Sequence, residues 1–285
     1  MSHIIQNKPE ISVLMSVYTE TEDAITIAVE SILGQTFTNF ELILVNDNPG
    51  SRETQNILEK LTSKDSRIQL LTNDRNRGLG YALNTAIQNA RADIVARMDT
   101  EDTSKPDRLA KQISFIEQQP NVDLLFTQWI DINERDEIVI QRPRQIDFAN
   151  IRKAFFTKSL LMHPTLVARK QVLLDNPYPE MDRPEDIVLW LQLIRKGYKF
   201  DVLEEPLYLY RIDRINIAQR HSKIKAYSTN LLPHLVRESR YYWSNIYFWL
   251  YFLRISFEYL VSRNIVIFKL FHVRAVQVWK VIFGA

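Results

Sequence analysis

The sequence predicts an α/β fold, in which a mostly parallel sheet is flanked by helices and followed by a helical C-terminal appendage. Three observations support this prediction. Strand-like and helix-like segments alternate through the first hundred residues, polar clusters follow three of the strand-like segments, and the composition changes after residue 213. Alternating strands and helices are typical of a Rossmann-like parallel sheet that is covered on both faces.

The expected strands of the first half are short apolar runs bounded by turn signals. The strongest turn signal is the Asn-Asp-Asn-Pro-Gly segment at 46–50. The helices between the runs have apolar residues at helical spacing, such as Ile25, Ala28 and Ile32. The expected order is strand 11–17, helix 23–33, strand 40–45, helix 54–61, strand 68–71, helix 80–90 and strand 94–98.

The middle of the sequence is less regular. Pro106 marks the start of a helix with apolar residues at helical spacing. Pro184 precedes a second helix, which ends at Gly197. Strands are expected at 122–127 and at 199–203.

The composition excludes several classes of protein. The chain has 285 residues, of which 46% are hydrophobic and 25% charged, as in ordinary globular proteins. It contains no Cys, which excludes disulfides, thiolate-bound zinc and a Cys nucleophile. Its first residues lack the apolar segment of a secretory signal. We therefore expect the protein in the reducing environment of the cytoplasm.

The charge is unevenly distributed. Residues 214–285 carry eleven basic and two acidic side chains, whereas residues 1–213 carry 25 basic and 32 acidic ones. Ten aromatic residues lie within 241–259, but charges interrupt the apolar stretches before they reach about 20 residues, the length that spans a membrane. We expect this tail to lie on an anionic membrane surface, at the inner face of the cytoplasmic membrane, or to form a homodimer interface. The acidic body argues against nucleic acid as a partner.

Three polar clusters follow predicted strands, at residues 18–20, 46–48 and 99–102. Ligands of parallel sheets bind outside the carboxyl ends of the strands. The last cluster holds three carboxylates, Asp99, Glu101 and Asp102, which repel one another unless a cation offsets their charge. Mn²⁺ and Mg²⁺ prefer such oxygen ligands. The alternative is an exposed acidic turn that stabilises the start of the next helix.

Several segments, in their order and spacing, resemble family 2 glycosyltransferases over roughly residues 10–220. The segments are SVLMSVYTE (12–20), SILGQTF (31–37), FELILVND (40–47), NRGLGYALN (76–84), ARMDTED (96–102), PDRL (106–109), HPT (163–165) and EDIVLWL (185–191). The resemblance implies the GT-A fold, a divalent metal and inverting transfer of a hexose from a UDP-sugar. It also implies a role in bacterial surface-polysaccharide synthesis, such as that of O-antigen, capsule or lipooligosaccharide.

The resemblance also assigns a nucleotide-sugar site. Tyr18 would form an aromatic wall of this site, and Asp47 would accept a hydrogen bond from uracil. An Asx turn is the structural alternative for Asp47. A guanidinium such as that of Arg211 matches phosphate oxygens. The complete expected set is Val17, Tyr18, Glu20, Asp47, Arg77, Gly78, Leu79, Asp99 and Arg211.

The candidate metal ligands implied by the resemblance are Asp99, Glu101, Asp102 and Asp213. The sequence does not decide between Glu101 and Asp102, and Asp213 stands where the family often has a His. Asp186, with Glu185 beside it, matches the family's catalytic base, which takes the proton of the attacking hydroxyl. The alternative for Asp186 is a helix N-cap.

His163 and Trp190 are the candidate acceptor residues, although the spacing of Trp190 with its apolar neighbours favours a position in the core. The expected acceptor is a glycan or a sugar carried on a lipid diphosphate. The catalytic domain would comprise residues 1–213, with a nucleotide-sugar half at about 10–105 and an acceptor half at about 106–213, and 214–285 would form the tail.

Two other functions are weighed against this one. A nucleotidyltransferase usually carries a Gly-rich, basic loop after its first strand, and residues 16–20 contain neither Gly nor Lys. A non-catalytic carbohydrate- or membrane-binding module would not require the carboxylate at Asp186.

Overall fold

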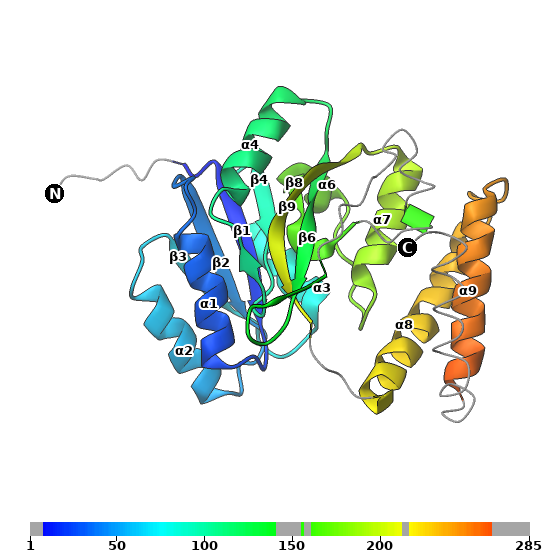
Figure 1. Ribbon diagram of the computed structural model, residues 1–285, viewed down its shortest axis with the longest axis horizontal. Helices are drawn as coiled ribbons and strands as arrows, with labels where there is room; N and C mark the ends of the chain where they lie inside the picture. Colours follow the sequence, from blue (N-terminus) through cyan, green and yellow to red (C-terminus); the bar gives the residue numbers. More distant parts are fainter. Residues whose placement is uncertain (1–7, 141–154, 157–160, 213–216, 264–285) are drawn as a thin grey trace. The chain divides into compact units, whose positions relative to one another are not determined.

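The computed structural model describes residues 8–140, 155–156, 161–212 and 217–263. These residues, whose helices and strands are labelled in Figure 1, divide into two units. The first unit contains 8–140, 162–178 and 199–212, and the second contains 155–156, 161, 179–198 and 217–263.

A single sheet forms the centre of the first unit. Its strands are β1 (Ile11–Val17), β2 (Phe40–Asn46), β3 (Ile68–Thr72), β4 (Ile94–Arg97), β5 (Thr103–Ser104), β6 (Leu124–Ile132), β7 (Ile138–Ile140), β8 (Val167–Arg169) and β9 (Phe200–Arg211). Their order is β3-β2-β1-β4-β8-β6-β9-β5, and β7 pairs with β6. The longer ladders are parallel, namely β2 with β1 and β3, β1 with β4, and β6 with β9. The mixed α/β, mostly parallel fold predicted from the sequence is therefore confirmed.

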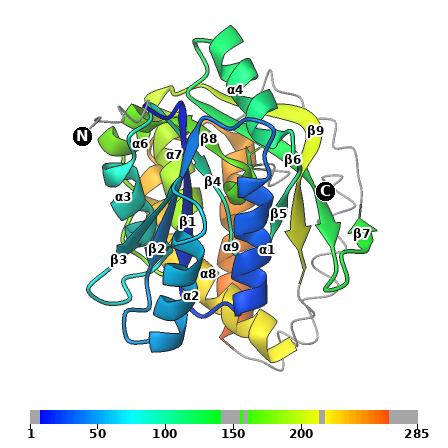
Figure 2. The same ribbon diagram turned by 90° about the vertical axis from the view of Figure 1, so that its left-hand side faces the viewer.

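Helices cover this sheet on both faces. They are α1 (Glu22–Leu33), α2 (Arg52–Thr62), α3 (Leu79–Asn89), α4 (Arg108–Gln118) and α6 (Lys170–Asp175), with a short 3₁₀ turn, η2 (His163–Thr165). α1 and α2 lie side by side on one face, whereas α3 crosses β1 and β2 on the other (Figure 2). Right-handed crossovers produce this arrangement, because the chain steps outward from β1 to β3 and then returns past β1 to β4.

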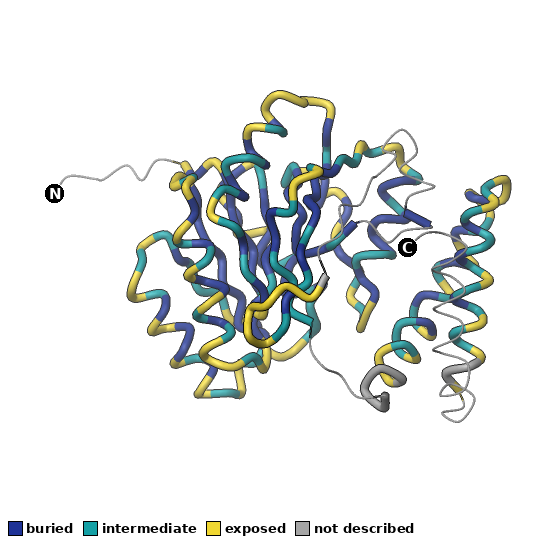
Figure 3. The backbone as a smooth tube through the Cα atoms, viewed as in Figure 1, coloured by how far each residue is buried: buried dark blue, intermediate teal, exposed yellow. Residues whose placement is uncertain are grey.

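The central strands β1 and β2 are buried almost throughout (Figure 3), as expected where helices cover both faces, whereas the edge strand β3 is mostly only partly buried. β1, β2 and β4 run in the same direction, so their carboxyl ends lie along one edge of the sheet. These ends are Val17, Asn46 and Arg97. The three polar clusters of the sequence therefore do share an edge.

Two parts of the fold differ from the sequence prediction. β9 continues to Arg211, whereas only 199–203 was expected to be a strand. Pro206 lies opposite Gln128, where the register between β6 and β9 shifts. A proline that would interrupt a regular ladder is tolerated at such an irregularity. β8 and α6, at 167–175, were not predicted.

The second unit contains α7 (Glu185–Lys196), α8 (Ile217–Glu238) and α9 (Ile246–Ser262). α8 and α9 pack side by side, and the Tyr227 and Tyr251 hydroxyls lie 2.9 Å apart. The Phe156 ring contacts Tyr242, Phe248 and Tyr251. Several of the crowded tail aromatics are thus internal to this unit. Among the residues described, no helix combines the length and the apolar character needed to cross a membrane.

α7 also belongs to this second unit, although the sequence analysis assigns it to the catalytic domain. The Tyr242 hydroxyl donates to the Leu191 carbonyl at 2.9 Å, and Arg195 forms an ion pair of 3.1 Å with Glu238. The helix with the expected catalytic base is therefore attached to the C-terminal helices.

Candidate functional site

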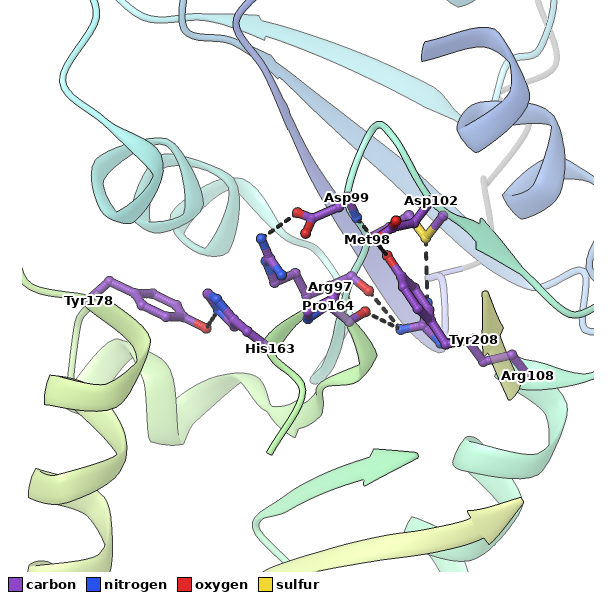
Figure 4. A network of polar contacts seen from close by, with 9 residues as sticks. All are labelled: Arg97, Met98, Asp99, Asp102, Arg108, His163, Pro164, Tyr178 and Tyr208. Atoms are coloured by element: carbon purple, nitrogen blue, oxygen red, sulfur yellow. Dashed lines mark hydrogen bonds and ion pairs between the residues drawn. The ribbon is translucent and has the colours of Figure 1, made fainter. Parts of the chain in front are cut away.

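The acidic turn after β4 is held by a tyrosine of β9 (Figure 4). The Tyr208 hydroxyl donates to Asp102 Oδ2 at 2.8 Å and accepts from the Asp99 backbone N–H at 3.3 Å. Asp102 Oδ1 accepts from the Arg211 backbone N–H at 2.8 Å. Burial, with the nearby Asp99 carboxylate, raises the pKa of Asp102 to about 7, although these hydrogen bonds oppose the shift. Asp102 thus faces the protein interior.

Asp99 forms an ion pair with Arg97, the last residue of β4. The Arg97 side chain is 4% exposed and that of Asp99 is 35% exposed. The guanidinium head extends from the strand end toward both Asp99 and His163 (Figure 4). The protein therefore supplies its own positive charge to the acidic turn.

A second arginine, Arg108, is fully buried beneath the turn. Its Nη2 donates to the carbonyls of Arg97 at 2.7 Å and Pro164 at 3.1 Å, and its Nη1 donates to Ser104 Oγ at 2.8 Å. Burial lowers the pKa of Arg108 to about 10, so it remains charged at neutral pH. This side chain connects the ends of β4, β5 and η2, which fixes the backbone that carries Asp99.

Asp47, after β2, organises the loop that leads into α3. Its Oδ1 accepts from Asn73 Nδ2 at 2.7 Å, and its Oδ2 accepts from the Gly78 backbone N–H at 3.1 Å. Gly78 has a φ of 84°, a conformation that favours glycine. Arg77 stacks 3.5 Å from the centre of the Tyr81 ring, and Leu79 begins α3. The carboxylate therefore shapes the loop from which the nucleotide contacts were expected.

The end of β1 is joined to the end of β2. The Tyr18 backbone N–H donates to Glu20 Oε2 at 2.6 Å, and the Tyr18 carbonyl accepts from Asn48 Nδ2 at 2.9 Å. The buried Val17 contributes its carbonyl, which accepts from the Asp47 N–H at 2.8 Å. Tyr18 as a residue is 44% exposed, which leaves its ring accessible to a ligand at this edge.

Arg211 is engaged within the protein. Its Nη2 bonds Asp136 at 2.6 Å, its Nη1 bonds the Asn133 carbonyl at 2.8 Å, and its Nε bonds the Glu101 carbonyl at 3.0 Å. The guanidinium that was expected to meet a diphosphate thus clamps the β6–β7 turn onto the acidic turn.

His163 is buried, and its Nε2 lies 2.9 Å from the Tyr178 hydroxyl. Burial, together with the charge of Arg97, holds the pKa of His163 well below its ordinary value, so the imidazole is neutral. Asn84 of α3 exchanges two hydrogen bonds with the Tyr178 backbone, of 2.8 and 2.9 Å. Figure 4 shows His163 on the other side of the Arg97 guanidinium from Asp99.

The remaining expected residues lie in the second unit or outside the description. Glu185 and Asp186 form the first turn of α7, where carboxylates favour the positive end of a helix. Glu185 is buried, whereas Asp186 is partly exposed. Trp190 is fully buried, as its spacing favours, and offers no surface to an acceptor. Asp213 lies outside the described residues.

The outer carboxylates of the acidic turn are suited to a divalent cation. Asp99 is partly exposed and Glu101 is exposed, and both offer the oxygen donors that Mn²⁺ and Mg²⁺ prefer. Asp102 differs, because both of its oxygens accept hydrogen bonds from the protein. In the described part of the chain, no three His, Asp or Glu side chains gather into a metal-binding group.

Sequence reasoning did not assign roles to Arg97, Arg108 or Tyr208. Arg97 and Arg108 lie inside segments that carry the family resemblance. Their place in these segments was the signal that could have marked them as candidate site residues. Arg108 and Gln112 are also one helical turn apart beside the apolar residues of α4, a pattern that indicates a buried polar pair. Tyr208 had no local signal, because its partners lie in a distant segment.

Comparisons with known proteins place the chain in a family. The profile of Glycosyl transferase family 2 matches residues 12–175. The glycosyltransferase MJ1057 of Methanocaldococcus jannaschii is 35% identical over 257 residues, which are 89% of each chain. The O-antigen biosynthesis glycosyltransferase WbnJ of Escherichia coli is 33% identical over 208 residues, which are 71% of this chain and 79% of WbnJ.

Solved structures share the GT-A fold. S. aureus TarS with UDP-GlcNAc has a TM-score of 0.61 and 19% identity, over 89% of this chain and 72% of that one. In the UDP complex of TarS, this chain spans 65% of the compared chain. The mannosyltransferase PcManGT of Pyrobaculum calidifontis, with GDP-Man and Mn²⁺, has a TM-score of 0.61 and 17% identity, over 95% of this chain and 80% of that one.

Proposed function

The chain belongs to glycosyl transferase family 2 and is a glycosyltransferase, and we propose that it moves a hexose from a UDP-sugar to a hydroxyl of a glycan or lipid-linked sugar. The observation that carries this proposal is the acidic turn at the carboxyl end of β4, on the same sheet edge as Asp47 and Tyr18. A role in polysaccharide synthesis is supported by similarity to WbnJ and to the amylovoran biosynthesis glycosyltransferase AmsE of Erwinia amylovora. Membership of this glycosyltransferase family argues against the alternative function of a nucleotidyltransferase.

The donor would bind along this edge in the first unit. The exposed Tyr18 ring is the proposed stacking surface for the base, and the loop that Asp47 fixes would supply backbone contacts from Gly78 and Leu79. Bound UDP-GlcNAc in TarS and GDP-Man in PcManGT support a nucleotide sugar as donor. We favour UDP because of the motif that contains Asp47.

Asp99 and Glu101 are the proposed ligands of Mn²⁺ or Mg²⁺, and the ion would offset the charge of the departing diphosphate. The hydrogen bonds that both Asp102 oxygens accept support Glu101, rather than Asp102, as the second ligand. Mn²⁺ in the PcManGT complex supports the choice of metal.

Asp186 is the proposed general base. It would take the proton of the acceptor hydroxyl as that oxygen attacks the anomeric carbon and the bond to the nucleotide breaks, which inverts the anomeric centre. Asp186 is more exposed than Glu185, which supports Asp186 as the residue that meets the acceptor.

The C-terminal helices are the proposed membrane-contact region. Ile246, Leu253, Phe257 and Leu260 are exposed and recur at helical spacing along one side of α9. The exposed Arg263 follows this stripe, and 214–285 carries eleven basic and two acidic side chains. An apolar stripe with basic flanks fits an anionic lipid surface. Residues 1–213 would then form the catalytic part and 214–285 the membrane-contact tail.

The membrane proposal predicts that the full chain binds vesicles of anionic phospholipid more strongly than zwitterionic vesicles in a sedimentation assay. Leu253→Gln with Leu260→Gln should abolish binding, whereas Ile27→Gln, an exposed apolar change in α1, should leave it intact. Equal sedimentation of both variants, or a concentration-dependent dimer that forms through α9 without lipid, would contradict membrane contact.

The catalytic proposal is tested with a panel of nucleotide sugars, with Mn²⁺, with Mg²⁺ and with a chelator. One UDP-sugar should be hydrolysed slowly in a metal-dependent way. Asp186→Asn should retain donor binding and lose transfer, and Asp99→Asn should lose metal-dependent binding. Asp175→Asn, a change at an exposed residue of α6, should change neither. Failure of every nucleotide sugar to bind with metal present would overturn the proposal.

A further inference from the structure

We propose that Arg97 is a positioning residue that competes with the divalent cation for the Asp99 carboxylate and thereby makes metal binding depend on the nucleotide diphosphate. The inference rests on the proposed metal site and goes beyond it, because it concerns which group pairs with the Asp99 carboxylate when no metal is bound. It is carried by the Arg97–Asp99 ion pair within the first unit.

The acidic turn brings several negative charges together, and in the described part of the chain Arg97 forms the ion pair with Asp99. Asp99 and Asp102 are close enough for the Asp99 charge to raise the pKa of Asp102, and the Arg97 charge opposes that rise. A guanidinium that pairs with Asp99 reduces this repulsion, which is also what a bound cation would do. Arg97 and the metal ion therefore serve the same electrostatic need at the same carboxylate.

The position of Arg97 makes this competition effective. Its side chain is 4% exposed, and ion pairs screened from water interact more strongly than exposed ones. Its backbone is fixed, because its N–H donates to the Leu166 carbonyl at 2.8 Å and its carbonyl accepts from Arg108 at 2.7 Å. A change of partner at Arg97 would therefore involve its side chain and not its backbone.

Of the two side chains that flank the guanidinium in Figure 4, Asp99 carries the negative charge. Figure 4 shows the Arg97 head between Asp99 and His163. His163 is neutral, since burial and the Arg97 charge both lower its pKa, and it offers no negative charge. A diphosphate would offer oxygens that a guanidinium pairs with readily. Arrival of the donor would therefore release Asp99 to the metal.

The first experiment measures free Mn²⁺ by electron paramagnetic resonance with the full chain, with and without UDP. Without UDP, Arg97→Met should bind Mn²⁺ at least about tenfold more tightly than the wild type, within the range typical of coupling between sites. Arg97→Lys keeps the charge and should stay near the wild type. The enhancement of Mn²⁺ affinity by UDP should be smaller in Arg97→Met than in the wild type.

Arg67→Met is the matched control. Arg67 pairs with Asp65 at 2.8 Å, which is also an arginine and an aspartate two residues apart, but before β3. This control should bind Mn²⁺ like the wild type. Equal or weaker Mn²⁺ binding by folded Arg97→Met, or equally tight binding by Arg97→Lys and Arg97→Met, would overturn the inference.

A second measurement needs no loss of the buried arginine. The ¹⁵N signal of the Arg97 guanidinium in the wild type, assigned by its absence in Arg97→Lys, should shift during a Mg²⁺ titration with the midpoint of metal binding. An unchanged signal at saturating Mg²⁺ would overturn the competition. If the wild type binds UDP but no metal, the proposed metal site itself fails. If the wild type and Arg97→Met bind the metal with equal affinity, only this inference is overturned.

Discussion

The Tyr208 hydroxyl on β9 donates a 2.8 Å hydrogen bond to Asp102, which lies 106 residues earlier in the sequence. The same hydroxyl accepts from the Asp99 backbone N–H, so one oxygen atom holds both ends of the acidic turn. Burial, with the Asp102 and Asp99 charges, raises the pKa of Tyr208 well above its ordinary value, so the hydroxyl keeps its proton and remains a donor.

Tyr208→Phe should destabilise the protein by about 1–3 kcal/mol, because a buried carboxylate oxygen and a backbone N–H lose their shared partner. Urea denaturation at pH 7 measures this change in the free energy of unfolding. Tyr210→Phe, two residues along the same strand, should cost less than half as much. Equal losses in the two variants would mean that Tyr208 contributes only packing.

Asp47→Asn should weaken UDP binding by about tenfold or more, which corresponds to about 1.4 kcal/mol. The amide that replaces the carboxylate presents a donor to the Gly78 N–H or to Asn73, where only acceptors fit. Calorimetry measures the affinity, and faster hydrogen exchange at Gly78 would identify the loop as the cause. Asp74→Asn, an exposed change in the same loop, should leave both measurements unaltered.

Arg108→Met should lower the free energy of unfolding by about 3–5 kcal/mol, the usual cost of breaking a buried charged network. The carbonyls of Arg97 and Pro164 would lose their donor. Lys111→Met on the same helix removes two surface ion pairs, with Asp107 and Glu205, and should cost at most about 1 kcal/mol. Thermal and urea denaturation of both variants would check the contrast, and similar losses would contradict the role given to Arg108.

We expect Glu41 to make the free energy of unfolding depend on pH. Burial raises its pKa, but hydrogen bonds from Ser12 and Arg91 outweigh burial and hold the pKa below the ordinary value. The stabilisation is therefore present above the unfolded pKa of about 4.3 and is lost as the pH falls through the lower folded pKa. Glu41→Gln should cost about 1–3 kcal/mol at pH 7 and much less at pH 3. Urea titrations between pH 7 and pH 3 measure this difference, and a constant difference would contradict it.

The sequence predicted the parallel half of the sheet because its strands are local apolar runs that end in polar turns. It also predicted α7, since Pro184 and Gly197 mark its ends and its first turn is acidic. The full length of β9 was missed, because Glu204, Glu205 and Pro206 look like a loop. That segment stays in the sheet through a register shift, which no local pattern predicts.

In the candidate site, too, the residues with a local sequence signal were predicted and their distant partners were not. The acidic turn and Asp47 were found because residue type and strand ends are visible in the sequence. Their partners were not, since Tyr208 and Gly78 reach these carboxylates through the tertiary fold. The clamp that Arg211 forms was also not predicted, because nothing in the sequence reveals that Asp136 lies beside it, and its expected diphosphate contact stays a prediction. The catalytic roles themselves stay predictions.

The attachment of α7 to the C-terminal helices has a consequence for protein engineering. Tyr242 and Glu238 bind α7 from the C-terminal side, so a fragment that stops at residue 212 would leave the Leu191 carbonyl and Arg195 without these contacts. A chimera that borrows the C-terminal hairpin of a relative should therefore also borrow residues 179–198. The exchangeable module of this enzyme is discontinuous in sequence, and it carries the proposed base together with the proposed membrane contact.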